Sequence, residues 1–516
     1  MTLRQLRRLT LARPFGNYSS TLVPMDHAAL MAKITAFFTS CGVNAYLVGG
    51  YLRDTLLGKP NNDIDLALNG NPVILGRELA RELCGTYVPL DRERGIVRIV
   101  FTGVAPTDGS IHVDLAPIMG SLEDDLSRRD FTVDAMACAL SSDLLDDLPG
   151  NLIDPLGGVQ DLNKGILRAV DSDVFSQDPI RLLRGIRVCG QADLVLEEAT
   201  KEIMIRDAHL ISSVSAERIR DEFLLILACP GARDHLYMLD SLGILGHVIP
   251  EIEVGKGVTQ PKEHYWDVFH HGVETVGFVE QVLARRGEPR AVYAAIPWGD
   301  GVEGYFDEEI GDGHNRTTLL KLGALLHDVA KPATKTMELD GRIRFFGHQH
   351  QGAQMVTEIL KRLRFSNRSI NLVQSLVEHH LRPGQLGQPG ELPTDKAIYR
   401  YFRQLGGTAI GAIYLNLADF LAARGPNLDE DDWLAHNRSI THVMDLGMNS
   451  HVGQPQPKLL DGYDLMDIFG LQPGPKVGQL LEVVNEAQAS GEVETREQAV
   501  VFVTGLAQSA NSLVIN

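Results

Sequence analysis

The most informative part of the sequence is Ala45-Tyr-Leu-Val-Gly-Gly-Tyr-Leu-Arg-Asp54, which continues after a short gap as Asn62-Asp-Ile-Asp-Leu66. Its apolar beginning predicts a buried strand that ends in Gly49 and Gly50, followed by a helix that begins near Tyr51. Glycines at such a junction let the backbone pass close to a phosphate, and the free N–H groups of a helix start attract anions. The first part of the stretch therefore predicts a place for a phosphate group.

The second part of the stretch carries two aspartates, Asp63 and Asp65, with Ile64 between them. On a strand this spacing puts both carboxylates on one face and Ile64 on the other. Two carboxylates on one face repel each other unless a cation lies between them, and such hard oxygen ligands suit Mg²⁺. Asp114 in Ile111-His-Val-Asp-Leu115 is the predicted third carboxylate, on the polar face of a strand expected beside the first. A solvated turn or an aspartate at a sheet edge would explain each feature separately.

In this order and spacing, the glycine turn and the acidic pair resemble the nucleotidyltransferases of the polymerase-beta superfamily. They resemble in particular the class II tRNA nucleotidyltransferases and bacterial poly(A) polymerases. Within residues 122–137, Arg128-Arg-Asp-Phe-Thr132 resembles the Arg-Arg-Asp-Phe-Thr motif of that family. The chain has Asp134 where the family commonly has Asn, so the resemblance supports no ribose contact at that position.

The resemblance implies a catalytic centre for nucleotide transfer. The catalytic carboxylates that would bind Mg²⁺ are Asp63, Asp65 and Asp114. Three carboxylates that hold two metal ions activate a 3′-hydroxyl, stabilise the in-line transition state and neutralise the leaving pyrophosphate. The residues that would hold the incoming nucleotide are Gly49, Gly50, Arg53, Arg129 and Asp130.

A second stretch, Phe175-Ser-Gln-Asp-Pro-Ile-Arg-Leu-Leu-Arg-Gly-Ile-Arg187, resembles the base-reading motif of the same family. The resemblance implies that Asp178 and Arg181 read the base, and that Arg184 and Arg187, on the same side of the helix, contribute to nucleotide binding. Cytosine and adenine both present an amino donor beside a ring-nitrogen acceptor, whereas guanine and uracil present the reverse. A carboxylate beside a guanidinium would therefore admit C and A and reject G and U. The alternative is an ordinary ion pair between residues three apart on a helix.

The C-terminal half carries a second candidate centre, His327-Asp328 at the end of an apolar helix. This doublet resembles the HD phosphohydrolase superfamily. By that resemblance the metal ligands are His271, His327, Asp328, His348, His379 and Asp419. His270 and His380 are adjacent competitors for two of these positions. Imidazole and carboxylate ligands suit several divalent metals, and the sequence does not choose among them.

Composition sets the outer limits. A length of 516 residues with 44% hydrophobic content predicts about three to four domains. The five scattered cysteines fit a reducing cytoplasm and exclude a disulfide framework. No apolar run approaches the roughly 18 residues of a membrane span. Because the formal charge is −19, any RNA-binding surface must be a local basic strip.

The expected architecture is an α/β nucleotidyltransferase head of the polymerase-beta type followed by an all-α neck, HD domain and tail. Residues 1–25 carry four arginines and no acidic residue, which resembles an organellar transit peptide but fits a disordered start or a misassigned initiator methionine at least as well. A Gly- and acid-rich piece of the HD domain, 287–313, is interpreted as a mobile insertion over the HD site or as a disordered loop. The expected divisions are 1–25 extension, 26–170 head, 171–255 neck, 256–440 HD domain and 441–516 tail.

Taken together, these observations predict an enzyme that adds C and A to the 3′ end of tRNA from CTP and ATP, with Mg²⁺ in the head and a divalent metal in the HD domain. The alternatives within the family are a poly(A) polymerase and an enzyme that adds only CC or only A. An alternative of another class is an HD phosphohydrolase whose head only senses nucleotides, and a third is a pure RNA-binding protein. The sequence indicates no membrane partner and makes no prediction of oligomeric state.

Overall fold

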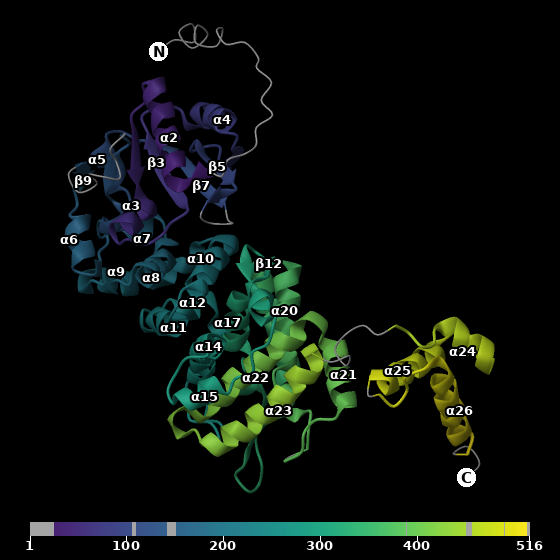
Figure 1. Cartoon of the computed structure of the whole chain (residues 1–516). Helices are drawn as coiled ribbons and strands as arrows, with labels where there is room; N and C mark the ends of the chain where they lie inside the picture. The colour runs from purple at the N-terminus through teal and green to yellow at the C-terminus, as the bar shows by residue number, and fades with distance from the viewer. Residues whose placement is uncertain are drawn as a thin grey trace, which may run out of the picture. The chain divides into compact units, whose positions relative to one another are not determined.

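The computed structural model describes residues 25–105, 110–141, 151–388, 390–449, 457–489 and 491–512 (Figure 1). Nearly all of the predicted extension 1–25 lies outside these residues. The chain divides into two compact units, Met1–Val170 and Asp171–Asn516, and each is described by itself. The finer division of the second unit into neck, HD domain and tail stays a prediction.

The first unit is built on a seven-stranded mixed sheet with the order β4-β5-β7-β3-β2-β8-β9. Strands β3 and β7 run parallel, and all other neighbours in this sheet run antiparallel. The strands are β2 (Ala45–Val48), β3 (Asp63–Leu68), β4 (Thr86–Asp91), β5 (Ile96–Thr102), β7 (Ser110–Pro117), β8 (Ala137–Ala139) and β9 (Leu152–Ile153). The predicted strand that carries Asp114 is β7, and it lies directly beside β3 as expected.

Alternation of apolar and polar residues gives this sheet two different faces. Ile64 and Leu66 on β3 and Val113 and Leu115 on β7 are fully buried, in one core with the apolar stripes of helices α2 and α4. The intervening aspartates are therefore directed to the opposite face. The remaining elements of the first unit are β1 (Met25–Asp26), α2 (His27–Cys41), α3 (Gly49–Leu56), α4 (Pro72–Glu82), β6 (Val104–Ala105), α5 (Leu122–Ser127), η1 (Thr132–Asp134), α6 (Gly158–Asn163) and β10 (Ile166–Leu167).

The second unit begins with a run of short helices, the predicted neck. These elements are α7 (Val174–Gln177), α8 (Arg181–Ala192), β11 (Val195–Leu196), α9 (Glu198–Asp207), η3 (Ala208–Ser213), α10 (Ala216–Ala228), α11 (Ala232–Ser241), α12 (Leu245–Val248) and α13 (Pro250–Glu253). A buried lysine, Lys321, ties this part to the next one. Its ammonium donates to the carbonyl of Leu227 at 2.8 Å and to Glu280 at 2.6 Å, and Glu280 accepts from two backbone N–H groups at the start of α11.

A helical bundle follows, with α14 packed against α17 and α22, and α20 packed against α17 and α19. Its helices are α14 (Val268–Ala284), α15 (Arg290–Ala294), α16 (Val302–Asp307), α17 (Arg316–Leu326), α18 (Lys331–Thr334), α19 (His348–Arg362), α20 (Asn367–His379), α21 (Asp395–Leu405), α22 (Ala409–Arg424) and α23 (Glu430–Asn449). Short turns and strands connect them: β12 (Glu309–Gly311), β13 (His314–Asn315), β14 (Lys335–Met337), β15 (Ile343–Phe345), η4 (Pro383–Gln385), η5 (Gly406–Thr408) and η6 (Gly425–Asn427). The chain ends with α24 (Gly462–Phe469), α25 (Pro475–Ala489) and α26 (Arg496–Ser512).

The disordered-loop interpretation of residues 287–313 is wrong. This piece contains α15, α16 and β12. Val292 and Tyr293 on α15 and Val302 and Phe306 on α16 are buried. Composition suggested disorder because the segment is rich in glycines and acids, but apolar side chains on both short helices are buried.

One helical stretch in the described part of the chain, Asp395–Asn427, is long and apolar enough to cross a membrane. Its apolar window is 72% buried inside the fold. Within that stretch, α22 packs against α14, α17 and α20. The burial of α22 among its neighbours accounts for the apolar composition, since a bundle core needs the same side chains.

Candidate functional site

The glycine turn of the head brings Gly49, Asp65 and Arg129 together. Helix α3 begins at Gly49, two residues earlier than expected, and Gly49 has a φ of +69°. A Cβ at this position would lie 3.0 Å from Arg129 Nη1 and 3.1 Å from Asp65 Oδ2. Both the left-handed backbone and the close approach therefore require glycine at this position. Within the described residues no side chain caps the N-terminus of α3, so its N–H groups remain available to an anion.

The three predicted catalytic carboxylates share the polar face of the sheet. Asp65 on β3 and Asp114 on β7 are register partners. Arg98, opposite Asp114 on β5, donates from Nε and Nη2 to the two carboxylate oxygens at 2.7 and 2.8 Å. Asp63 lies 2.8 Å from Nδ1 of His112, its own register partner. Asp114 and Asp63 thus each have a polar partner, and Asp65 is the neighbour of both, two residues from Asp63 on β3 and in register with Asp114 on β7.

The pKa of Asp65 is strongly shifted from its ordinary value. Burial raises its pKa to about 7, and the nearby charges of Asp114 and Asp63 act in the same direction against the attraction of Arg129. A partly buried carboxylate beside two others is stabilised in its charged form by a cation. The donor set, three carboxylates on adjacent strands, fits a hard divalent ion such as Mg²⁺.

The predicted nucleotide-binding arginines of the head differ in their surroundings. Arg53 is buried, and its guanidinium bonds to Asp54 and to Asp134, each at 2.8 Å. Asp134, which departs from the family pattern, is therefore the counter-ion of Arg53. Arg129 instead lies beside Gly49, with an ion pair to Asp125 at 3.8 Å. The neighbouring Asp130 contributes its backbone carbonyl, which accepts from Val170 N–H at 3.2 Å.

In the second unit, the predicted base-reading residue Asp178 is held by an arginine that the sequence did not single out. Arg218 on α10 donates from Nη1 and Nη2 to the two carboxylate oxygens at 3.0 and 2.8 Å. Although burial opposes ionisation, the bonds and charge of Arg218 lower the pKa of Asp178. Arg181 Nη1 donates to the carbonyl of Val174 at 3.3 Å. Arg184 and Arg187 both donate to Glu222 on α10, at 3.3 and 2.7 Å.

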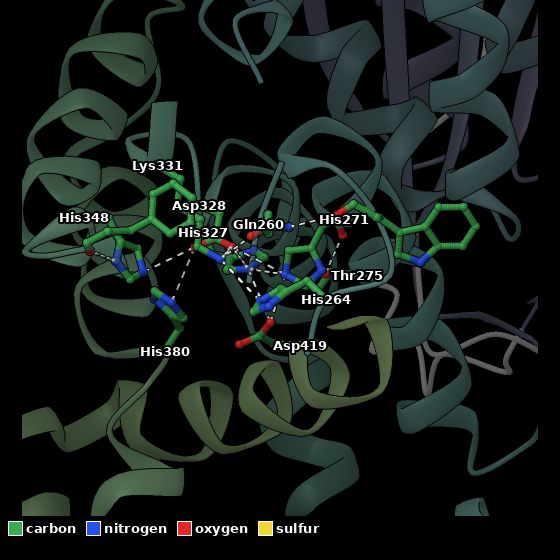
Figure 2. Close-up of polar contacts among 12 residues, drawn as sticks. Gln260, His264, His271, Thr275, His327, Asp328, Lys331, His348, His380 and Asp419 are labelled. Carbon is green, nitrogen blue, oxygen red and sulfur yellow. Dashed lines mark hydrogen bonds and ion pairs between the residues drawn. The ribbon is translucent and has the colours of Figure 1, made fainter. Parts of the chain in front are cut away.

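The HD residues form a buried cluster around Asp328 (Figure 2). Asp328 Oδ2 lies 3.4 Å from His271 Nε2 and 3.2 Å from His327 Nε2. Its other oxygen, Oδ1, lies 3.3 Å from His348 Nε2 and 3.8 Å from His380 Nε2. Asp419 Oδ1 closes the first group at 2.9 Å from His271. Two groups of residues could each hold a metal ion, because the potential ligand atoms within each group all lie within 4.8 Å of one another. One group is His271, His327 and Asp419, and the other is His327, Asp328 and His380.

Three of these imidazoles are oriented by backbone carbonyl groups close to them in the chain. Nδ1 of His327, His348 and His380 lies 2.8, 2.7 and 2.7 Å from a carbonyl oxygen three residues earlier in the chain. A neutral imidazole that donates from Nδ1 has its lone pair on Nε2. All three Nε2 atoms face Asp328, and in the neutral form each would present its lone pair there, which is the arrangement that metal-binding histidines adopt.

The structure corrects one predicted ligand. His380, and not His379, belongs to the cluster: His380 is buried and faces Asp328, whereas His379 is half-buried beside Glu378. At the other ambiguous position the prediction of His271 agrees with the geometry. His270 is 43% exposed and lies 2.8 Å from Asp267, outside the cluster.

The cluster already contains two positive charges that balance its carboxylates. Burial lowers the pKa of His327, but the ion pairs with Asp328 and Asp419 outweigh it and raise that pKa to about 10. Lys331, also buried, donates to Asp328 Oδ2 at 2.5 Å and to Gln260 at 2.6 Å. Two imidazole-carboxylate groups that share His327 fit divalent transition metals.

Sequence reasoning missed Arg98, His112, Lys331 and Arg218. His112 shares the polar face with Asp114 by alternation, and Lys331 follows Asp328 at helical spacing, so both left a weak signal. Arg98 and Arg218 left none that is local, because each meets its aspartate through sheet or helix packing.

Comparison with known proteins places each of these regions. The Poly A polymerase head domain family matches residues 45–168, the family described as "Probable RNA and SrmB- binding site of polymerase A" matches 193–255, and the HD domain family matches 305–424. The A-adding tRNA nucleotidyltransferase of Deinococcus radiodurans is 35% identical over 466 residues, covering 89% of this chain and 94% of the relative. The CC-adding tRNA nucleotidyltransferase of Thermus thermophilus is 31% identical, covering 89% and 93%.

The fold is shared with solved CCA-adding enzymes. The Thermotoga maritima CCA-adding enzyme in complex with tRNA has a TM-score of 0.56 at 19% identity, with 93% of this chain and 95% of that chain covered. A CCA-adding enzyme in complex with CTP has a TM-score of 0.59 at 19% identity, with 93% and 94% covered. With a glycine turn beside paired aspartates, a matching head family and relatives that span most of its length, this chain belongs to the tRNA nucleotidyltransferase family.

Proposed function

We propose that this enzyme completes the 3′ end of tRNA by adding C and A from CTP and ATP. The observation that carries the proposal is the position of Asp65, next to Asp114 in register and against the Gly49 turn. The names of the relatives, all tRNA nucleotidyltransferases, support tRNA as the acceptor.

In this proposal Asp63, Asp65 and Asp114 hold Mg²⁺. When bound, the metal lowers the barrier to attack of a 3′-hydroxyl on the α-phosphate and neutralises the departing pyrophosphate. The N–H groups at the start of α3 donate hydrogen bonds to the triphosphate oxygens, and Arg129, beside Gly49, adds a positive charge there. Arg53 supports this turn and does not contact the triphosphate directly in our proposal, because it is buried and paired with Asp54 and Asp134.

Base selection is assigned to Asp178 and Arg181. The carboxylate accepts from the amino group of C or A, and the guanidinium donates to the adjacent ring nitrogen. Uracil and guanine place a carbonyl against the carboxylate and an N–H against the guanidinium, so both are repelled. Arg184 and Arg187 support this region through Glu222.

The deciding experiment uses tRNA transcripts that end before CCA, after the first C, or after CC, each with one labelled nucleotide at a time. Addition of C, C and then A, with arrest after the last A, is the expected result. Long A tails on any RNA would replace the proposal by poly(A) polymerase activity.

A partial activity is the second candidate, because the two relatives described above are an A-adding and a CC-adding enzyme. An A-adding enzyme would use only the transcript that ends in CC, together with ATP. A CC-adding enzyme would use CTP alone and leave that transcript unchanged. The same set of transcripts therefore separates all three activities.

We propose a second, metal-dependent activity for the HD cluster, hydrolysis of phosphate esters such as a 2′,3′-cyclic phosphate or a 2′-phosphate at an RNA end. His271, His327, Asp328 and Asp419 would hold one metal, and His348 and His380 a second on the other oxygen of Asp328. A metal-bound water attacks phosphorus near neutral pH because the metal lowers its pKa. The identity of the metal is left to experiment.

The assay compares the wild type with a His327→Ala/Asp328→Ala double variant on a 2′,3′-cyclic nucleotide, with Mg²⁺, Mn²⁺ or Ni²⁺. Loss of hydrolysis with nucleotide addition intact supports two independent sites. Absence of hydrolysis with every metal, together with no metal retained by the wild type, would overturn the assignment.

Two readings of another class remain testable. If the HD cluster were the working enzyme and the head only a nucleotide sensor, Asp63→Ala with Asp65→Ala would leave the protein's activity unchanged. Our proposal expects that double variant to lose nucleotide addition and to keep any phosphatase activity. Detection of a single CMP addition excludes a pure RNA-binding protein. A cytoplasmic location is proposed on the free state of all five cysteines.

A further inference from the structure

The orientation of the Asp178 carboxylate is set by a residue from another helix. It lies between α7 and α8 on an extended backbone, followed by Pro179, and its side chain is 30% exposed. The only bonds to its side chain recorded among the described residues come from Arg218, 40 positions later on α10. The two N–H donors of one guanidinium meet the two oxygens of one carboxylate, which is the bidentate geometry that lysine cannot reproduce.

This geometry leaves Asp178 able to bind another donor. A carboxylate offers about four acceptor positions on its two oxygens, and the Arg218 fork uses one on each oxygen. The other position on each oxygen stays available, in a direction that the fork determines. Without the fork, the carboxylate would rotate about its χ angles and present a spread of acceptor directions.

We infer that Arg218 is a positioning residue that sets the nucleotide preference of the enzyme by fixing the Asp178 carboxylate, without touching the base itself. The inference rests on the proposed base-reading role of Asp178. A fixed, charged carboxylate rewards the amino group of cytosine and repels the carbonyl of uracil. A rotating carboxylate attracts the cytosine amino group less and repels the uracil carbonyl less. The preference for CTP over UTP should therefore fall by a larger factor than the rate of CTP addition.

The test measures kcat and KM for CTP and for UTP on a tRNA transcript that lacks CCA. Arg218→Ala should lower the CTP-to-UTP ratio of kcat/KM by about tenfold, the size that one good hydrogen-bonding pair contributes to base discrimination. Arg218→Lys keeps the charge but loses the fork, so it should recover only part of the ratio. Arg220→Ala is the matched control, since Arg220 lies on the same helix but pairs with Asp221 and Asp312.

Coupling to Asp178 separates positioning from a structural role. In an Asp178→Ala background, Arg218→Ala should change the ratio less than twofold, because there is no carboxylate left to position. Thermal unfolding identifies any variant that fails to fold, and Arg218→Gln, which keeps one donor on a neutral side chain, then replaces Arg218→Ala.

Two outcomes overturn the inference alone: Arg218→Ala lowers CTP and UTP use by the same factor, or it still changes the ratio in the Asp178→Ala background. If Asp178→Ala itself keeps the wild-type ratio, the proposed base-reading role fails, and the inference fails with it.

Discussion

Asp65 and Asp114 are direct register partners on the parallel strands β3 and β7, and only one of them has a bidentate arginine. Arg98 takes both oxygens of Asp114, while the half-buried Asp65 has a pKa raised to about 7. Asp114 therefore already has donors on both oxygens before any metal binds, whereas the carboxyl group of Asp65 keeps its proton up to a pH of about 7. A metal ion at this face would have to ionise Asp65 and share Asp114 with Arg98.

Asp65 should make the metal-free protein less stable as the pH rises. Its folded pKa, about 7, lies above the ordinary value of 3.8, so the folded chain holds a proton that the unfolded chain has lost. That contribution to stability is present at low pH and is lost as the pH rises through 7. Asp65→Asn removes the titration, so the melting temperature of the variant relative to wild type should increase from pH 5 to pH 8. A constant difference would contradict the raised pKa, and Mg²⁺ should reduce the difference at pH 8.

Gly49→Ala should disable nucleotide addition, and Gly58→Ala should not. Both glycines have left-handed backbones, with φ of +69° and +67°, so alanine costs about 1–2 kcal/mol of strain at either position. Only at Gly49 does the new methyl group also meet Arg129 and Asp65. Steady-state CTP incorporation and chemical denaturation of both variants separate the two effects. Equal activity losses would show that backbone strain alone is responsible.

Arg98→Met should destabilise the head by about 1–3 kcal/mol in the absence of metal, since it leaves the half-buried Asp114 without its two donors. Saturating Mg²⁺ should restore much of that stability. Arg94→Met is the control, because its contact with Asp91 is exposed, and exposed ion pairs contribute little. Urea unfolding with and without Mg²⁺ measures both variants, and a loss that Mg²⁺ does not reduce would argue against a metal on Asp114.

His380→Ala should lower the metal content of the HD cluster, and His379→Ala should leave it unchanged. The two residues are adjacent, yet only His380 directs Nε2 toward Asp328, at 3.8 Å. Elemental analysis of each variant after loading with Mn²⁺ or Ni²⁺ and desalting gives the answer. Equal retention by both variants would place the second metal position elsewhere.

Metal binding to the HD cluster should release a proton at pH 8. His327 has a pKa raised to about 10 by its ion pairs, so it is protonated at that pH, whereas a ligating imidazole must be neutral. Calorimetric titration of the metal in buffers of different ionisation enthalpy reports about one proton released per ion bound to this histidine. The His327→Ala variant lacks this imidazole proton, so it should release fewer protons per metal ion bound.

Local patterns predicted the sheet and its acidic face well. The alternation of Ile64 and Leu66 with the aspartates depends only on neighbouring residues, and β3 and β7 lie side by side as expected. His380 could not be distinguished from His379, because adjacent helical residues differ by about 100° around the axis and packing decides which one faces inward. The partners Arg98 and Arg218 could not be predicted either, since each reaches its aspartate through tertiary structure.

The carbonyl groups behind His327, His348 and His380 have a consequence for how an ion would enter the HD cluster. Each ring is oriented by a peptide group three residues earlier in the chain, so the ligand directions are set by the backbone at the ends of α17 and α20 and at the end of strand β15. Such preorganisation means that little chain entropy remains to be lost on coordination. The spacing of the backbone segments that carry these rings then fixes the size of the site. Because the ligands cannot adjust, the site should select ions by their radius.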